Sequence, residues 1–366
     1  MRNNLLQRAE KICLLESETG NLAGAEKVLR ELTLQAPTGA ECKRLGPTSE
    51  GAGHDLMITL RGSGKGGALL LGHYDTVPRA EGQKLWNRQD DKILGLGAYD
   101  MKGGLAIILE LLEQWSHKPE EFEVIHALIL GDEEWRLKPP IYRFSPWYNC
   151  QALLCFEGGE PDFKHSLVHG RFGASVVKTI ISCDPIRAEH PLAGPSTVDA
   201  TALAIQKMQE ITLEGMPSLQ ITPTQLSAES AVNVVPGQSI ITSVARFRDQ
   251  VLLDEALNSL TAALPEFSIE HDIDHRFPAL TPTSQGEATI ELIKKEFPEL
   301  HVVHRTGSSD VCWFAKGFPT IFDGLGPCGG GEHSRHEWVD AVSFEHQYQL
   351  ANSILSVLFK SSRCNF

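Results

Sequence analysis

Six side chains that can bind a metal ion or transfer a proton follow apolar or Gly-rich segments of this chain. His73, for example, comes directly after the apolar run 68–72. Because the carboxyl ends of parallel strands meet at one edge of a sheet, we expect such residues to line an active site there. In chain order they are His73, Asp100, Glu133, Glu134, Glu157 and His333.

Imidazole and carboxylate ligands without thiolates are typical of catalytic zinc. Two histidines and three carboxylates can hold two ions if one carboxylate bridges them, and two ions can clamp both an attacking water and a carbonyl oxygen. The remaining carboxylate would then be a general base. Adjacent Glu133 and Glu134 fit this division, one as the base and the other as a ligand, although a Glu pair alone is equally typical of a solvated turn.

Asp75 is placed to accept the other ring N–H of His73, which would fix the tautomer that binds a metal. The alternative is a histidine and a helix cap with purely structural roles, because the His-x-Asp pattern is common. The metal interpretation therefore depends on the pattern as a whole.

The composition is that of an ordinary globular chain. Its 366 residues, 42% apolar and 22% charged, predict two domains with full cores. The net charge of −14 argues against nucleic acid or an anionic membrane as a partner, although it also serves solubility. Eight cysteines without a CxxC motif predict reduced thiols. With no signal-peptide core and no apolar run of about 18 residues, we expect a cytoplasmic protein.

Apolar periodicity predicts alternating helices and strands in the first half of the chain. Residues 135–149 are expected to form a Pro- and aromatic-rich loop. This order predicts an α/β fold with a mixed sheet. The expected helices are 4–16, 21–35 and 101–117, and the expected strands are 41–46, 54–61, 68–72, 90–96, 122–130 and 153–156.

The pattern changes near Gly170, where a β-α-β-β-α-β order predicts a small inserted α+β sandwich. We therefore assign residues 1–171 and 283–366 to a catalytic domain and residues 172–282 to the insertion. The insertion's expected strands are 172–183, 219–226, 239–248 and 267–273, and its expected helices are 197–210 and 251–264. The returning chain is expected to add helices at 286–296, 310–316 and 344–359 and strands at 301–305 and 320–322.

Several motifs in register point to one family. In these motifs and their order the sequence resembles the M20 family of dinuclear zinc metallopeptidases and deacylases, over nearly the whole chain. The resemblance implies a zinc-exopeptidase-like catalytic domain and an inserted lid domain. The motifs are GHYDTVP (72–78), GAYDMKGG (97–104), GDEE (131–134), FEG (156–158), NVVPG (233–237) and GPCGGGEHSRHEWV (326–339).

The resemblance also implies which residues bind the metal ions. His73, Asp100 and Glu157 resemble the ligands of one zinc ion. His333, Asp100 and Glu134 resemble those of the other, with Asp100 bridging. The cofactors implied are two Zn²⁺ ions per chain, with Co²⁺ or Mn²⁺ as substitutes.

Other roles follow from the same resemblance. Glu133 resembles the base that takes a proton from the metal-bridging water and passes it to the leaving amine. Asp75 resembles the residue that orients the first histidine. The peptide bond between Asp100 and Met101 is expected to be cis.

Three residues of the insertion also match the family. His190 resembles the lid histidine that a neighbouring subunit supplies to stabilise the tetrahedral oxyanion, and a surface residue is the less favoured alternative. Asn233 resembles the lid asparagine that lines the same cleft. Arg246 resembles the arginine that grips a substrate carboxylate, and Arg248, on the same face of the strand, is the alternative.

The chain departs from the family's pattern in places. Residues 135–140 replace the usual small turn after Glu134, and Asp199 replaces the common lid asparagine. Glu157, where other members have Asp, is more like the deacylase and carboxypeptidase branch than the di- and tripeptidase branch.

The last motif leaves two histidines as candidate ligands. Arg335 and His336 stand where Pro-Asp is frequent, so His333 and His336 compete. We assign His333, because its spacing to Glu337 matches the family.

The resemblance predicts a zinc-dependent hydrolase that cleaves an amide bond of a small substrate with a free carboxylate, releasing a C-terminal amino acid as glutamate carboxypeptidases do. The alternative is an N-acyl amino acid deacylase, such as an acetylornithine deacetylase or a succinyl-diaminopimelate desuccinylase. A non-catalytic binding protein on the same fold would be expected to lack a ligand or the base, yet all six positions are filled. The expected partners are the substrate and a second copy bound through the lid domain.

Overall fold

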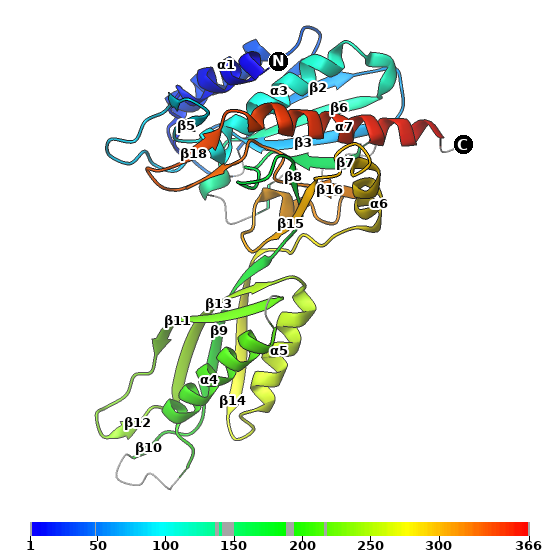
Figure 1. Cartoon of the computed structure of the whole chain (residues 1–366). Helices are drawn as coiled ribbons and strands as arrows, with labels where there is room; N and C mark the ends of the chain where they lie inside the picture. Colours follow the sequence, from blue (N-terminus) through cyan, green and yellow to red (C-terminus); the bar gives the residue numbers. More distant parts are fainter. Residues whose placement is uncertain are drawn as a thin grey trace. The chain divides into compact units, whose positions relative to one another are not determined.

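The structure is a computed structural model that describes residues 2–47, 49–135, 139–140, 150–187, 194–215 and 218–364. The chain forms two compact units (Figure 1). The first unit comprises residues 1–169, 282–303 and 314–366, and the second comprises residues 170–281 and 304–313.

One segment lies outside its predicted domain. Residues 304–313 were assigned to the catalytic domain by sequence, but they belong to the second unit. The reason is local hydrogen bonding, because Ser308 accepts a hydrogen bond from Arg246 Nη1 at 3.1 Å and donates one to the carbonyl oxygen of Phe172 at 2.9 Å.

A six-stranded mixed sheet with the order β1-β2-β6-β3-β7-β16 forms the centre of the first unit. Strands β6, β3, β7 and β16 run parallel, whereas β1 and β2 pair antiparallel. The predicted mixed α/β sheet is therefore confirmed. The strands are β1 (Glu41–Leu45), β2 (Asp55–Arg61), β3 (Gly67–His73), β6 (Val124–Leu130), β7 (Cys150–Cys155) and β16 (Thr320–Phe322).

Helix α3 (Gly103–Ser116) lies at the centre of the core, with apolar residues buried around most of its circumference. A helix that is apolar all round needs neighbours on all sides, and α1, α7 and β3 supply them. Its Trp115 ring meets the rings of Phe122 and Phe359 edge-on, with centroids 6.2 and 5.0 Å away. The other long helices of this unit are α1 (Arg2–Cys13), α2 (Leu22–Gln35), α6 (Ser284–Ile293) and α7 (Ser343–Cys364).

A small second sheet, ordered β17-β18-β5-β4, brings the loop after β17 next to the turn before α3. The strand expected at 90–96 is present at Lys92–Leu94 and forms the second strand of a hairpin that the sequence did not predict. In its turn Asp90 adopts φ 55°, a left-handed conformation that Asp tolerates. Its strands are β4 (Asn87–Gln89), β5 (Lys92–Leu94), β17 (Gly329–Gly330) and β18 (Trp338–Asp340).

Strands β8 (Ser166–Arg171) and β15 (His301–Arg305) form a two-stranded sheet. β8 is fully buried, yet the sequence did not predict it. Its Ser, His, Gly and Arg residues interrupt the apolar pattern that identifies a buried strand.

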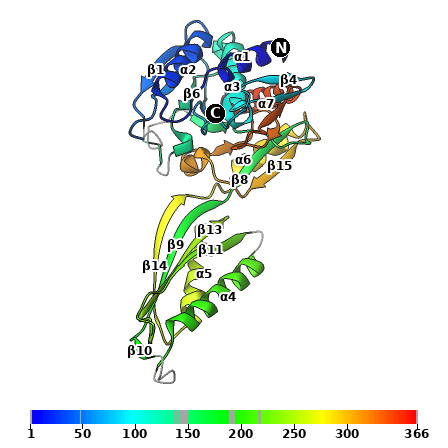
Figure 2. The same cartoon turned by 90° about the vertical axis from the view of Figure 1, so that its left-hand side faces the viewer.

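The second unit is a four-stranded antiparallel sheet with the order β11-β13-β9-β14. Helices α4 and α5 cover one face of this sheet, as both views show (Figures 1 and 2). The element order matches the predicted α+β sandwich. Its elements are β9 (Gly173–Ser182), β10 (Ile186–Arg187), α4 (Thr197–Gly215), β11 (Leu219–Ser227), β12 (Val234–Val235), β13 (Gln238–Phe247), α5 (Gln250–Ala262) and β14 (Ser268–Phe277).

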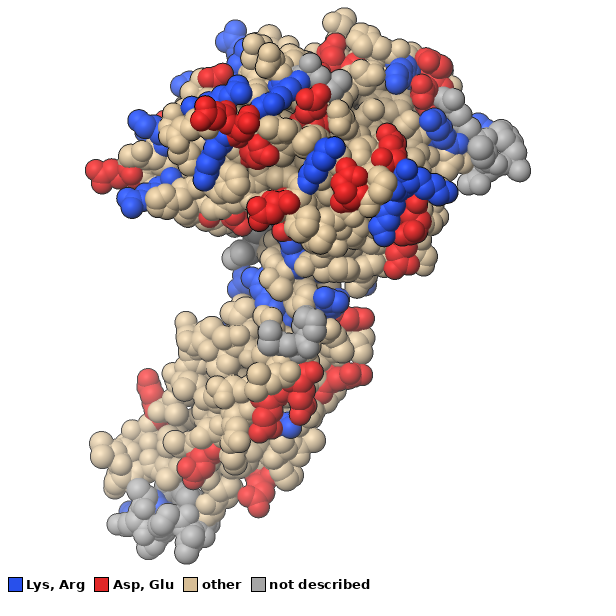
Figure 3. All heavy atoms as spheres, viewed as in Figure 1, with Lys and Arg blue, Asp and Glu red and all other residues tan. Residues whose placement is uncertain are grey.

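Charged side chains are mixed on the surface. Figure 3 shows acidic and basic residues interspersed over the visible face of the first unit, so the net charge of −14 is not gathered into one patch on that face. Within the described part of the chain, no helix combines the length and the apolar character needed to cross a membrane.

Candidate metal centre

The candidate ligands meet at the carboxyl edge of the central sheet. His73 is the last residue of β3, Glu157 lies two residues after β7, and Glu134 lies in the short 3₁₀ helix Glu133–Trp135 after β6. Asp100 occupies the turn that leads into α3, and His333 comes from the loop after β17. All of them belong to the first unit.

These side chains form two groups that share Asp100. In each group, the potential ligand atoms lie within 4.8 Å of one another. The first group is His73, Asp100 and Glu157, and the second is Asp100, Glu134 and His333.

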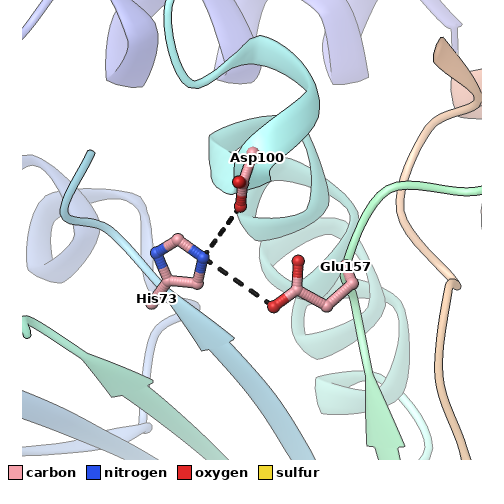
Figure 4. Close-up of side chains that lie close together, drawn as sticks. All are labelled: His73, Asp100 and Glu157. Atoms are coloured by element: carbon pink, nitrogen blue, oxygen red, sulfur yellow. Dashed lines mark hydrogen bonds and ion pairs between the residues drawn. The ribbon is translucent and has the colours of Figure 1, made fainter. Parts of the chain in front are cut away.

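The two oxygens of Asp100 point to different histidines. His73 Nε2 lies 3.1 Å from Oδ1, and His333 Nε2 lies 3.1 Å from Oδ2. His73 Nε2 is also 3.8 Å from Glu157 Oε1, and Figure 4 shows these three side chains converging from separate elements. His333 Nε2 is 3.2 Å from Glu134 Oε2. A carboxylate directed at two imidazoles in this way can bridge two ions.

The two groups differ in their access to solvent. The side chain of His73 is 2% exposed, whereas that of His333 is 57% exposed. The first group is therefore enclosed by the sheet and α3, and the second is open on one side to solvent.

Asp75 anchors both the first histidine and the loop after β6. Its backbone oxygen is 3.1 Å from His73 Nδ1 and its Oδ1 is 3.4 Å from the same atom, so the backbone makes the shorter contact. The backbone N–H groups of Glu133 and Glu134 donate to its two carboxylate oxygens at 3.1 Å each. Thr19 Oγ1 donates to Oδ2 at 2.7 Å. Asp75 therefore fixes the position of two candidate catalytic segments at once.

Glu337 has the same function for the turn that carries Asp100. Its buried carboxylate accepts hydrogen bonds from the backbone N–H groups of Gly97, Tyr99 and Asp100 at 2.9, 2.9 and 3.1 Å. Because Glu337 lies four residues after His333, it also ties the loop of the second histidine to the turn that carries Asp100. The Asp100–Met101 peptide bond in this turn is cis, as the resemblance implied.

The pKa values show how strongly the centre couples its charges. Burial raises the pKa of Asp100, but hydrogen bonds and charge from His333 and His73 outweigh burial and hold it below its ordinary range. The hydrogen bond to Asp100 raises the pKa of His333 to about 9. Burial lowers the pKa of His73, but its contacts with Asp100 and Asp75 raise it well above normal. Burial and the neighbouring charge of Asp100 raise the pKa of Glu134 to about 7.

The donor set fits a pair of divalent cations. Three carboxylates and two imidazoles are hard or borderline ligands that suit zinc and similar ions. Burial and the charge of Asp100 raise the pKa of Glu134, and bound cations would favour its ionised form. Because Asp100 belongs to both ligand groups and directs one oxygen toward each histidine, it is the residue that both ions would share.

The remaining predicted site residues lie outside the first unit or outside the described residues. Asn233 is an exposed turn residue before β12, and Arg246 is half-buried on β13; both belong to the second unit. His190 lies outside the described residues, as does most of the predicted 135–149 loop. His336 is exposed and belongs to neither metal-ligand group.

Sequence reasoning missed two anchoring side chains. Thr19 stands 56 residues before Asp75 and carries no local signal of its role. Glu337 served only as a spacing mark in the sequence, because its backbone partners lie more than 230 residues away.

The comparisons with known proteins agree with this geometry. Residues 69–357 match the model of peptidase family M20/M25/M40. A succinyl-diaminopimelate desuccinylase of Herminiimonas arsenicoxydans is 24% identical and covers 96% of this chain and 99% of its own length. Carboxypeptidase G2 of Pseudomonas sp. is 25% identical, and the match covers 96% of this chain and 88% of that protein. An acetylornithine deacetylase of Aliivibrio fischeri is 42% identical over only 85 residues. That match covers 21% of this chain and 22% of the deacetylase.

Solved structures agree in fold. A tripeptidase from Staphylococcus aureus has a TM-score of 0.75 at 20% identity and covers 98% of this chain and 99% of its own. A dinuclear metal-binding M20 peptidase from Bacillus subtilis has a TM-score of 0.73 at 11% identity and covers 98% of both chains.

The fold and the paired ligand groups are those of a metallohydrolase. The chain belongs to peptidase family M20/M25/M40.

Metal binding should strengthen with pH. Below their raised pKa values His333 and His73 are protonated, and a metal ion must displace those protons to bind. Between pH 6 and 8 we expect the apparent affinity of the metal-free protein for Zn²⁺ to rise about tenfold per pH unit for each displaced proton. Competition with a chromophoric chelator measures this, with His117→Gln as an exposed control. An affinity that does not change with pH would remove the histidines from the ligand set.

Loss of the Glu337 carboxylate should weaken the metal centre. In Glu337→Gln, an amide N–H faces backbone donors, so the turn that carries Asp100 loses acceptors. We expect Zn²⁺ affinity to fall about 10- to 100-fold, more at the His333 group than at the His73 group. Glu332→Gln removes the same charge from the same loop and should have a small effect. Unchanged affinity in Glu337→Gln would show that the turn holds its position without this side chain.

Proposed function

We propose that the chain is a zinc-dependent amide hydrolase that releases a C-terminal amino acid from a small substrate with a free carboxylate, as a glutamate carboxypeptidase does. The observation that carries this proposal is the pair of ligand groups joined by Asp100, with Glu133 adjacent to the ligand Glu134. The full-length similarity to carboxypeptidase G2 supports the type of substrate.

In the proposed reaction, water adds its oxygen to the amide carbonyl carbon, the C–N bond breaks, and a proton reaches the leaving nitrogen. When bound, two zinc ions would supply the Lewis acidity that polarises a carbonyl and makes water more acidic. Glu133 takes the proton of the water and then donates it to the departing amine. The residues that would hold the ions are His73, Asp100, Glu134, Glu157 and His333.

The surroundings of Glu133 support its role as the base. Its backbone N–H is fixed to Asp75 Oδ1 at 3.1 Å. Its charge contributes to the raised pKa of His73, so its carboxylate lies within electrostatic reach of the first ligand group. Glu134, next to it, is taken up by the second group.

We propose that Arg246 binds the substrate carboxylate. Its guanidinium is half-buried and is held by Ser308 Oγ at 3.1 Å, which limits the orientations it can adopt. A guanidinium oriented in this way can form a two-pronged contact with a carboxylate. Arg248, two residues further on, is exposed and has its guanidinium carbon 5.7 Å from the centre of the Phe172 ring. In the same proposal, His190 stabilises the oxyanion and Asn233 lines the cleft.

The second candidate function is deacylation of an N-acyl amino acid. The 42% identity to acetylornithine deacetylase over 85 residues and the full-length similarity to a desuccinylase favour it. Both candidates use the same amide chemistry and the same base; they differ in which side of the amide carries the group that the protein recognises.

We also propose that the protein works in the cytoplasm as a homodimer formed through the second unit. The free thiols of seven described cysteines support a reducing compartment. Strand β11 is an edge strand of the four-stranded sheet in the second unit, and it exposes Leu226 at 60%. An edge strand with an exposed apolar residue is a surface that a second copy can extend.

An amine-release screen tests the function. N-acyl glutamates and dipeptides represent the first candidate, and N-acetyl, N-succinyl and N-formyl amino acids represent the second. Glu133→Gln should retain both metal ions and lose about 10²- to 10⁴-fold in kcat, because it cannot accept a proton. Glu81→Gln, in an exposed loop, is the control. Full turnover by Glu133→Gln would exclude it as the base. No release from any substrate would contradict both candidates and leave either a different substrate or a binding protein.

The two arginines are distinguished by kinetics. Arg246→Ala should raise KM about 10- to 100-fold for the carboxylate substrate found in the screen, because a charge-assisted hydrogen bond is lost, and should matter far less for the matching carboxamide. Arg248→Ala is the control and should change KM little. The reverse result would assign the carboxylate to Arg248.

Sedimentation of the full chain tests the dimer. We expect a dimer that Leu226→Lys shifts toward monomer, because a lysine at an edge strand opposes pairing. Leu292→Lys, at an exposed apolar position of the first unit, should leave the mass unchanged. A monomeric wild-type protein would contradict the proposal.

A further inference from the structure

A polar cavity of about 250 Å³ lies beside the metal centre in the first unit. Its inner wall is formed by the buried residues Ser17, Thr76, Leu96 and Lys102. Exposed side chains of Glu16, Glu18, Asn21 and Arg79 surround its mouth. No part of the mechanism proposed above uses this cavity.

Two buried polar groups on the inner wall have spare hydrogen-bonding capacity. Thr76 is 1% exposed, and within the described part of the chain its Oγ1 has no hydrogen-bond partner. Lys102 is also 1% exposed, and its Nζ donates to the carbonyl oxygen of Leu15 at 2.7 Å. Among the described residues this is the one hydrogen bond that the ammonium makes, although it can donate three.

These two side chains are neighbours. A Cβ placed on Gly97 would lie 2.9 Å from Thr76 Cγ2 and 3.2 Å from Lys102 Cδ, so both side chains pass over the same glycine. A buried ammonium and a buried hydroxyl on neighbouring side chains can both donate to an anionic acceptor, and leaving buried donors unsatisfied is costly.

We propose that this cavity binds a free α-amino acid. Its carboxylate accepts hydrogen bonds from Lys102 Nζ and Thr76 Oγ1 at the inner wall, and its ammonium group faces the carboxylate of Glu18 at the mouth. Arg79 and Glu16 already pair with each other at 2.9 Å, which leaves Glu18 as the acid available for a ligand. A volume of about 250 Å³ has ample room for a small amino acid such as alanine.

The cavity has a position from which its ligand can affect the metal centre. Thr76 follows Asp75 directly, and Lys102 stands two residues after Asp100. The proposal does not depend on the proposed reaction, although an enzyme that releases amino acids would make a ligand of this class.

Calorimetric titration of the zinc-loaded protein tests the site, with L-alanine, acetate and ethylamine as probes. The Arg246→Ala background suppresses carboxylate binding at the proposed active site. We expect L-alanine to bind more tightly than acetate, and ethylamine not to bind. Thr76→Val keeps the shape and removes the hydroxyl, so it should weaken L-alanine binding about three- to tenfold.

Thr320→Val is the matched control. Thr320 is fully buried in β16, and its hydroxyl also lacks a partner among the described residues, but it does not line the cavity. Urea unfolding of both variants checks that they fold, and a crystal of the complex should show L-alanine against Lys102. Equal L-alanine affinity in wild type and Thr76→Val, or no binding to either, would overturn the site. Thr76-dependent L-alanine binding by a protein that hydrolyses no substrate would overturn the proposed function alone.

Discussion

The placement of one carboxylate between two imidazoles is the constraint on which this structure depends. Asp100 presents one oxygen to His73 and the other to His333, at 3.1 Å each. A charge in such an enclosed position is stable only if its partners are fixed, because any loss of alignment leaves it desolvated and unpaired. The central sheet, the turn before α3 and the loop after β17 must therefore be held in fixed positions around Asp100.

Two further acids hold these segments in position without serving as ligands. Asp75 and Glu337 each accept backbone N–H groups from a loop that carries candidate ligands. A carboxylate that accepts several backbone donors acts as a rigid clamp, because the loop cannot move without breaking several hydrogen bonds together. Function here depends as much on these anchors as on the groups that face the ions.

The sequence predicted those parts of the structure that local patterns specify. Apolar runs located β3, β6 and β7, and the change of pattern near Gly170 located the second unit. Long-range hydrogen bonds were not predictable, because nothing near Thr19 or Glu337 in the sequence indicates a partner 56 or more than 230 residues away. β8 was missed for a related reason, since a polar side chain in it can find a distant partner: Arg171 Nη1 donates to the carbonyl oxygen of Gly307 at 3.0 Å.

The metal centre draws on residues from Thr19 to Glu337, and both segments of the second unit are encoded between Glu157 and His333. This arrangement has a consequence for synthesis on the ribosome. The first histidine, the shared aspartate and Glu157 emerge early, but His333 and Glu337 emerge only after the second unit has been made. A nascent chain can therefore complete one ligand group long before the other. The paired centre is among the last features of the protein to form, and a chain that stops short of residue 333 would carry at most half of it.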